Sequence, residues 1–236
     1  MGSCFRYFLA GVALALCAVP LGAQSPLSKS SPTPAEQNRR TGLDPGTVTG
    51  GVYRNRSLLL SVKIPEGWVL RTAEMNERED ASPDAAAENP RSAQDQGSAS
   101  PSPDSRGGCA SGCSRVLLAA FSRPPEAKGE DVNGSILIAA ESVSTYPGLK
   151  EAAQYFGPLT EVARAQGFTV DEEPYEFALG ERNLVRGDFH KDVGTRVMRQ
   201  STLALLSHGY AISITVIGGT EDEVEELIDR VTFAGK

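Results

Sequence analysis

The sequence predicts an α+β fold in which an antiparallel β-sheet is flanked by helices. Residues 175–217 contain successive short runs in which apolar and polar residues alternate, which is the period of β-strands. Residues 220–233 carry apolar residues at helical spacing within an acidic segment. Runs of strands separated by single helices are typical of a layered antiparallel sheet rather than of parallel βαβ units.

Residues 1–23 have the layout of a signal peptide. Arg6 precedes an apolar run over residues 7–19, and small residues lead to a cleavage site after Ala23. The run is too short to span a membrane comfortably, so we expect cleavage, with a retained signal anchor as the alternative. Leu16 is large where a lipid-attachment site needs a small residue, which disfavours a lipoprotein anchored at Cys17. The prediction is a secreted or periplasmic protein with no transmembrane segment after signal removal.

Two stretches of low complexity follow. Residues 24–46 are rich in Ser, Pro and Thr and cannot bury enough apolar surface to order, so we expect a disordered linker. Residues 73–112 are dominated by small and charged residues and are expected to loop out of the sheet as an insertion. The sequence therefore predicts a single domain over residues 47–236 that this insertion interrupts.

The mature chain keeps only Cys109 and Cys113, which lie within the insertion. In an oxidising compartment we expect them to form a small local disulfide. Redox activity is an alternative, but the spacing is not Cys-x-x-Cys and no helix start follows. Metal binding is weaker still, because two thiols without a nearby histidine do not complete a tetrahedral site.

Strands and one helix are predicted before residue 170. Residues 52–64 indicate two strands with a turn near Asn55, and residues 116–121 and 136–143 indicate two more. Residues 149–166 have helical spacing. Pro158 is expected to kink or break this helix, because proline cannot donate a backbone hydrogen bond.

Two hairpins are predicted next, over residues 177–189 and 201–217. In the second, His208 and Gly209 form the turn, since glycine supplies the positive φ that a two-residue loop needs. This turn pairs Leu205 with Ile212 and Leu203 with Ile214 on one core face. If Val185 and Phe189 share that face, the connection around residues 192–194 must have an odd number of residues.

A helix is predicted over residues 220–233. Thr220 and Glu223 have the spacing of a capping box, and the acidic first turns suit the helix dipole. One apolar stripe consists of Val224, Leu227, Ile228 and Val231. We expect this stripe to pack on the sheet.

Several short motifs together resemble the family of PsbP, the extrinsic protein of photosystem II, and its Mog-type relatives. They are the strand entry with Tyr53 and Asn55, the run Ile64-Pro-Glu-Gly-Trp68, the central helix, the hairpins at Leu179-Gly180 and Gly209-Tyr210, and the close of the last helix at Val231-Thr-Phe233. The resemblance implies an α/β/α sandwich and a group whose members mostly act by binding or assembly. It carries over no functional residues, and the insertion after Trp68 departs from the family pattern.

The only histidines are His190 and His208. Asp188, His190 and Asp192 would share one strand face, which could form a metal or acid–base site. Side chains at this spacing diverge along a strand, so a solvated strand end is the preferred interpretation. His208 is expected to lie exposed in its turn.

Basic residues gather within residues 182–199, against a net charge of -7. They are Arg182, Arg186, Lys191, Arg196 and Arg199, together with His190. A surface patch for an anionic partner is one interpretation, and a solvated face paired with the acidic last helix is the other. The negative net charge argues against a nucleic-acid binder.

The sequence contains no Gly-x-Ser-x-Gly, Walker loop, dinucleotide glycine pattern or His-Glu-x-x-His, so we predict no catalytic residues, metal or cofactor. The leading hypothesis is an exported, non-catalytic binding or assembly module of the cell envelope with an unknown protein partner. One alternative is an enzyme of an unrecognised class that uses Asp188, His190 and Asp192. Another is a carrier that holds a small ligand or lipid between sheet and helix.

Overall fold

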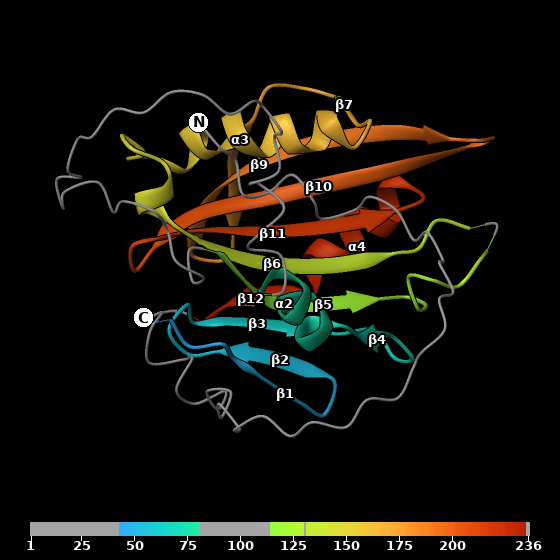
Figure 1. Ribbon diagram of the computed structural model, residues 1–236, viewed down its shortest axis with the longest axis horizontal. Helices are drawn as coiled ribbons and strands as arrows, with labels where there is room; N and C mark the ends of the chain where they lie inside the picture. The colour runs from blue at the N-terminus through green and yellow to red at the C-terminus, as the bar shows by residue number, and fades with distance from the viewer. Residues whose placement is uncertain (1–42, 81–113, 130, 235–236) are drawn as a thin grey trace, which may run out of the picture.

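The structure is a computed structural model that describes residues 43–80, 114–129 and 131–234 (Figure 1). The predicted signal peptide, most of the linker and most of the insertion lie outside the described residues. Cys109 and Cys113 lie outside them too, so the disulfide stays a prediction. No helix among the described residues is long and apolar enough to cross a membrane.

The described residues form two antiparallel sheets. The smaller sheet has the order β1-β2-β3-β12 and consists of β1 (Thr47–Thr49), β2 (Val52–Asn55), β3 (Leu60–Lys63) and β12 (Val231–Phe233). The larger sheet has the order β4-β5-β6-β11-β10-β9-β7, and β8 also pairs with β9. Its strands are β4 (Val69–Leu70), β5 (Ser114–Phe121), β6 (Ser135–Ser142), β7 (Thr169–Val170), β8 (Tyr175–Leu179), β9 (Arg182–Val193), β10 (Arg196–Ser207) and β11 (Tyr210–Gly218).

Short helices accompany the sheets. The α-helices in the described residues are α2 (Thr72–Asp80), α3 (Ala152–Ala165) and α4 (Glu221–Asp229), and η1 (Val143–Thr145) is a 3-10 turn. The α3 helix contacts β9 and β10 at the opposite end of the molecule from the smaller sheet, whereas α4 contacts β10 and β11 (Figure 1).

The predicted α/β/α sandwich is wrong, because the described residues are mostly strands in two sheets. The predicted and observed folds differ after Asp229, because α4 ends there whereas the predicted helix runs to Phe233. The β-branched and aromatic residues Val231–Phe233 favour a strand, and they form β12. Val231 pairs with Val62 of β3, so a second sheet covers part of a face that the prediction gave to helices.

The predicted hairpin over residues 201–217 is confirmed. Leu203 pairs with Ile214 and Leu205 with Ile212 across β10 and β11. His208 and Gly209 both have positive φ, 52° and 78°, as a type I′ turn requires. His208 also lies exposed, as expected.

The turn between β9 and β10 holds two residues, an even number, because Val193 pairs with Arg196. The predicted odd-numbered connection is therefore wrong. Since side chains alternate along a strand, the even turn sets Arg186 opposite Leu203. A charged side chain thus takes the core position that was predicted for Val185.

The two faces of the larger sheet carry separate cores. Leu203, Ile214, Leu227 of α4 and Val62 of the smaller sheet belong to one buried cluster. The other face is covered by α3, whose apolar residues form a second cluster. Its fully buried members are Tyr155, Phe156, Ala163, Phe168, Phe189, Ala204 and Ala211, and Val185 packs at its edge. The strands that separate these clusters therefore have no solvated face over much of their length.

The α3 helix continues through Pro158, so the predicted break is wrong. The missing proline N–H leaves the carbonyl of Gln154 without its helical partner, but Gln154 is exposed and water can bond that carbonyl. Tyr155 and Phe156 are almost completely buried and hold the helix against the sheet. Tertiary packing therefore outweighs the local preference.

The outer edge of β5 is closed by side chains of α2, a helix inside the segment predicted to be unstructured. The Asn76 amide accepts a hydrogen bond from the Val116 N–H and donates one to the Val116 carbonyl, both at 2.9 Å. The Thr72 hydroxyl accepts one from the Ala119 N–H at 2.9 Å. An unpaired strand edge can pair with another chain, and α2 blocks this.

Asn76→Ala is expected to destabilise the docking of α2 by about 1 to 2 kcal/mol, since it removes a pair of hydrogen bonds to the β5 backbone. Hydrogen exchange at the Val116 amide should accelerate by about tenfold. Glu77→Ala changes an exposed residue of the same helix and serves as the control. Equal exchange at Val116 in both variants would show that α2 does not protect this edge.

Candidate functional site

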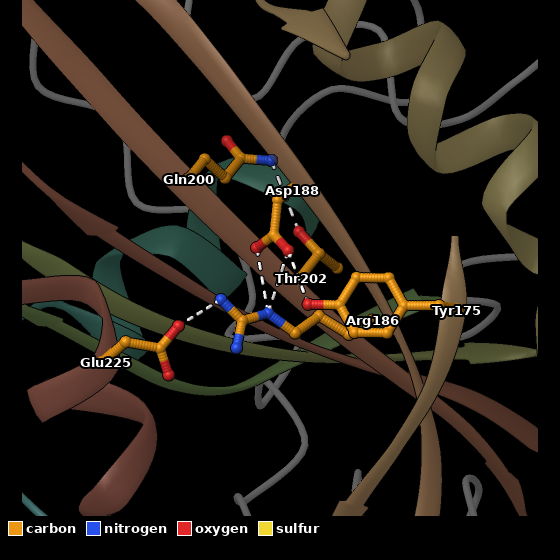
Figure 2. A network of polar contacts seen from close by, with 6 residues as sticks. All are labelled: Tyr175, Arg186, Asp188, Gln200, Thr202 and Glu225. Carbon is orange, nitrogen blue, oxygen red and sulfur yellow. Dashed lines mark hydrogen bonds and ion pairs between the residues drawn. The ribbon is translucent and has the colours of Figure 1, made fainter. Parts of the chain in front are cut away.

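A partly buried cluster of polar and charged side chains joins β8, β9 and α4 (Figure 2). The Nε of Arg186 lies 3.0 Å from both carboxylate oxygens of Asp188, and the Tyr175 hydroxyl donates to Asp188 at 2.9 Å. A terminal nitrogen of Arg186 donates to Glu225 of α4. The guanidinium also lies 5.2 Å from the centre of the Phe177 ring. Arg186 thus links the edge of the larger sheet to α4.

Tyr175 and Arg186 both keep their protons near neutral pH. Burial raises the pKa of Tyr175 to about 12, and the hydrogen bond to Asp188 contributes to this rise. Burial acts to lower the pKa of Arg186, but hydrogen bonds to Glu225 and Asp188 outweigh it and raise this pKa above its ordinary value. Tyr175 therefore remains a donor and Arg186 a cation. We interpret the cluster as a structural ion-pair network.

Figure 2 also shows Gln200 and Thr202 of β10, whose side chains form a separate polar pair. The Gln200 amide donates to the Thr202 hydroxyl at 3.3 Å. Thr202 pairs with Gly187 in the sheet, so this pair belongs to the face opposite Arg186. Ser201, between them in sequence, is fully buried beside Asp188 and its hydroxyl has no hydrogen-bond partner among the described residues.

The structure does not bring Asp188, His190 and Asp192 to one point. Asp188 bonds Arg186, whereas Nδ1 of His190 contacts the carboxylate of Asp171. Asp192 is exposed near the hairpin tip. Within the described residues no group of three or more metal-ligating side chains could hold an ion.

The structure places Arg182, Arg186, His190, Lys191 and Arg196 of the predicted patch in different surroundings. Arg186 is only 7% exposed and lies in the core. Arg182 stacks over the Phe233 ring, and Arg196 pairs with Asp131. The ammonium of Lys191 donates to the Gln166 carbonyl at 2.7 Å, at the C-terminal end of α3, while His190 contacts Asp171. Each of these groups therefore has a partner within the chain.

A second buried polar cluster lies under α3, where the carboxyl group of Glu141 is only 4% exposed. The Tyr155 hydroxyl donates to it at 2.8 Å, and the Tyr146 hydroxyl bonds its other oxygen. Burial raises the pKa of Glu141, and the hydrogen bonds from the two tyrosines oppose this rise. Burial also raises the pKa of Tyr155, so this hydroxyl stays protonated.

An open cleft of about 260 Å³ lies between α4 and the residues around β4. Its apolar wall includes Trp68, Ile217 and Leu227, and Glu226 and Arg230 lie at its charged side. Glu226 and Arg230 pair with each other at 2.7 Å. Trp68 is the only tryptophan in the chain and is half-buried.

A larger open cleft of about 450 Å³ lies under the tip of the β9–β10 hairpin. Arg196 and Arg199 line it from β10, and Glu221 lines it from the first turn of α4. Val132 and Glu223 line both clefts, so the two adjoin. We call the pair the α4 groove; Trp68 lies in one cleft and Arg199 in the other, and charged side chains line both.

Sequence reasoning missed both the α4 groove and the Glu141 cluster. The pattern around Trp68 indicates only the end of a strand segment. Glu141 follows the run of apolar residues 136–140, and a lone carboxylate in such a run is the one signal that could have marked it. The residues that line the α4 groove come from distant segments, which no local pattern joins.

No protein-family model matches the chain, and no curated protein matches it. Among solved structures, it resembles LpqN of Mycobacterium tuberculosis, a protein involved in cell envelope biogenesis. That likeness has 14% identity and a TM-score of 0.32, and it covers 86% of this chain and 97% of LpqN.

Two other solved structures resemble the chain. A protein of unknown function from Pseudomonas aeruginosa is 15% identical with a TM-score of 0.31, over 48% of this chain and 72% of that one. A protein from Bacteroides thetaiotaomicron is 11% identical with a TM-score of 0.37, over 80% of this chain but only 50% of that one. These three likenesses are distant resemblances of fold that carry no conclusion about function, and none of them is named as a PsbP or Mog-type protein.

Proposed function

We propose that this protein is an exported, non-catalytic binding or assembly module of the cell envelope, and that a protein partner binds in the α4 groove. The observation that carries the proposal is the groove itself, where Trp68 lies among charged side chains that include Glu226, Arg230 and Arg199. Protein interfaces commonly combine an aromatic anchor with a polar rim. The partner that fits is a segment with one large apolar side chain flanked by charged ones.

The arrangement of the buried polar groups supports binding over catalysis. The charge of Arg186 is compensated within the chain by Asp188 and Glu225. Asp188 and His190 have different partners, so the rival enzyme hypothesis lacks a shared centre at these residues.

A carrier function is the second candidate, and it needs a cavity between sheet and helix. Val224, Leu227 and Ile228 of α4 are buried in the core cluster and fill this position in the described part of the chain. Both described clefts are open to the surface. These observations favour a partner that lies in a groove over a ligand enclosed in the interior.

Photo-crosslinking in the native envelope tests the proposed groove. A photoreactive residue at Val132, which lines both clefts, is expected to capture a protein partner. The same residue at Val48, which is 40% exposed on β1, is the matched control and should give no such product. Trp68→Ala should weaken capture from position 132. Equal capture at both positions, or none at 132 in the native envelope, would contradict a partner site in the groove.

Export is tested separately by the N-terminus of the protein purified from its own cells. Cleavage after Ala23 is expected to give a mature chain that begins at Gln24. N-terminal sequencing or intact mass measures this directly. A chain that keeps Met1 and remains in the cytoplasmic fraction would contradict the exported part of the proposal, whatever the groove binds.

A further inference from the structure

Glu141 is a buried carboxyl group that no cation contacts within the described residues. It lies on β6 and is 4% exposed, and its hydrogen-bond partners are the hydroxyls of Tyr146 and Tyr155. Tyr155 belongs to α3, and Tyr146 follows η1 in the segment that leads into α3. The carboxyl group therefore lies at the junction between the sheet and the helix that covers it.

The surroundings of Glu141 give its negative charge little compensation. Ala211 of β11 and Ser114 of β5 lie directly opposite it on the neighbouring strands, and both are uncharged. The groups that face it from the helix side are the two tyrosines, whose rings contact each other edge to face at 5.4 Å. Its hydrogen-bond partners are thus two neutral donors, and Ser213, a further buried polar residue beside Tyr155, is also uncharged.

We propose that Glu141 makes the packing of α3 on the larger sheet depend on pH. Protonated Glu141 stabilises this packing, and ionised Glu141 weakens it. A charge in an apolar site costs more than a neutral acid, so ionisation favours states in which water reaches the carboxylate. Separation of the Tyr155 side of α3 from the sheet would let water reach it. Such opening would expose Phe156 and the apolar face that it covers.

The direction of the pH dependence follows from proton binding. Burial raises the pKa of Glu141 in the folded state, so the folded state holds a proton that the unfolded state has released. The stabilisation is complete below the unfolded pKa and is lost as pH rises through the raised folded pKa. Between those two pKa values, the protection of the α3 amides should fall by about tenfold per pH unit.

The test is hydrogen exchange of the α3 amides in the full chain from about pH 4 to about pH 8, which starts near the unfolded pKa of glutamate. Protection factors are used because they divide out the intrinsic pH dependence of exchange. In the wild type, protection of α3 should fall through the window while β11 changes little. Glu141→Gln keeps the size of the side chain without the ionisation, and its α3 protection should not depend on pH.

Two variants distinguish ionisation of Glu141 from titration of a neighbouring group. His190→Gln removes an imidazole that contacts Asp171 beside β7, and it should keep the wild-type response. Tyr155→Phe removes a hydrogen bond that favours the ionised form, so it should move the fall in protection to higher pH. Unchanged pH dependence in Glu141→Gln, or its loss in His190→Gln, would overturn the proposal.

Discussion

Arg186→Met is expected to lower the free energy of unfolding by about 3 to 5 kcal/mol, because it leaves a carboxylate without its buried cation. The Arg186 side chain is 9% exposed and that of Asp188 is 18% exposed, so neither charge has free access to water. Methionine preserves much of the apolar contact with Phe177 and isolates the loss of charge. Chemical denaturation followed by the fluorescence of Trp68 measures the effect.

Two further variants separate the contributions of the ion pairs in this network. Glu225→Gln should cost about 0 to 1 kcal/mol, since the Glu225 side chain is 48% exposed and solvent screens the pair. Arg186→Met combined with Asp188→Leu should recover much of the lost stability, because both buried charges are then absent. A combined variant as unstable as the sum of its parts would contradict the network as the cause.

Gly187→Ala is expected to destabilise the protein by about 1 to 3 kcal/mol through overpacking under α3. A Cβ atom at position 187 would lie 2.5 Å from Cε1 and 2.9 Å from Cδ1 of the Phe156 ring. Phe156 is 2% exposed, so its ring has no free space into which it can move. Thermal denaturation should show a lower midpoint for this variant.

A double-mutant cycle identifies the cause of that loss. Phe156→Ala alone should cost about 3 to 5 kcal/mol, because it leaves a cavity. In the Phe156→Ala background, Gly187→Ala should cost nothing or stabilise the strand, since the clash is gone and glycine is a poor strand residue. A coupling energy of about 1 to 3 kcal/mol is expected. Simple additivity would show that the ring of Phe156 does not set the requirement for glycine.

The register of the β10–β11 hairpin could be predicted because alternation and turn chemistry agree there. His208 and Gly209 fix the loop length, and Leu203 must then pair with Ile214. Between β9 and β10 turn chemistry does not fix the loop length, so the odd-numbered connection followed only from placing Val185 and Phe189 on the main core face. A change of one residue in the length of this loop decides whether the side chain of Val185 or that of Arg186 faces the main core.

The helix prediction was wrong where the pattern of a short segment is compatible with both a helix and a strand. Val231 continues the stripe of α4 at helical spacing, but pairing with Val62 is a contact from the other end of the chain that no local pattern reveals. The low-complexity composition of residues 73–112 likewise led to a prediction of no structure there, although most of α2 lies in this segment. Ala73, Glu74, Met75 and Arg78 are good helix formers, and this propensity was the available signal.

The candidate site was the least predictable part of the molecule. Asp188 and His190 drew attention because they are close in sequence, whereas the structure gives them separate partners. The α4 groove joins Trp68 beside β4, residues of the β5–β6 connection, and the two ends of α4. The α4 groove depends on the position of the C-terminal end of α4, which β12 sets.

The pairing of β12 with β3 is therefore the feature to measure by NMR. We expect cross-strand NOEs between the Hα protons of Val62 and Val231, and between those of Leu60 and Phe233, as their antiparallel pairing requires. Lys63 should also have a slowly exchanging amide, because its N–H donates to the Arg230 carbonyl at 3.0 Å. Helical NOEs from Ile228 to Val231, with no contact between Val231 and Val62, would contradict the two-sheet architecture and the groove built on it.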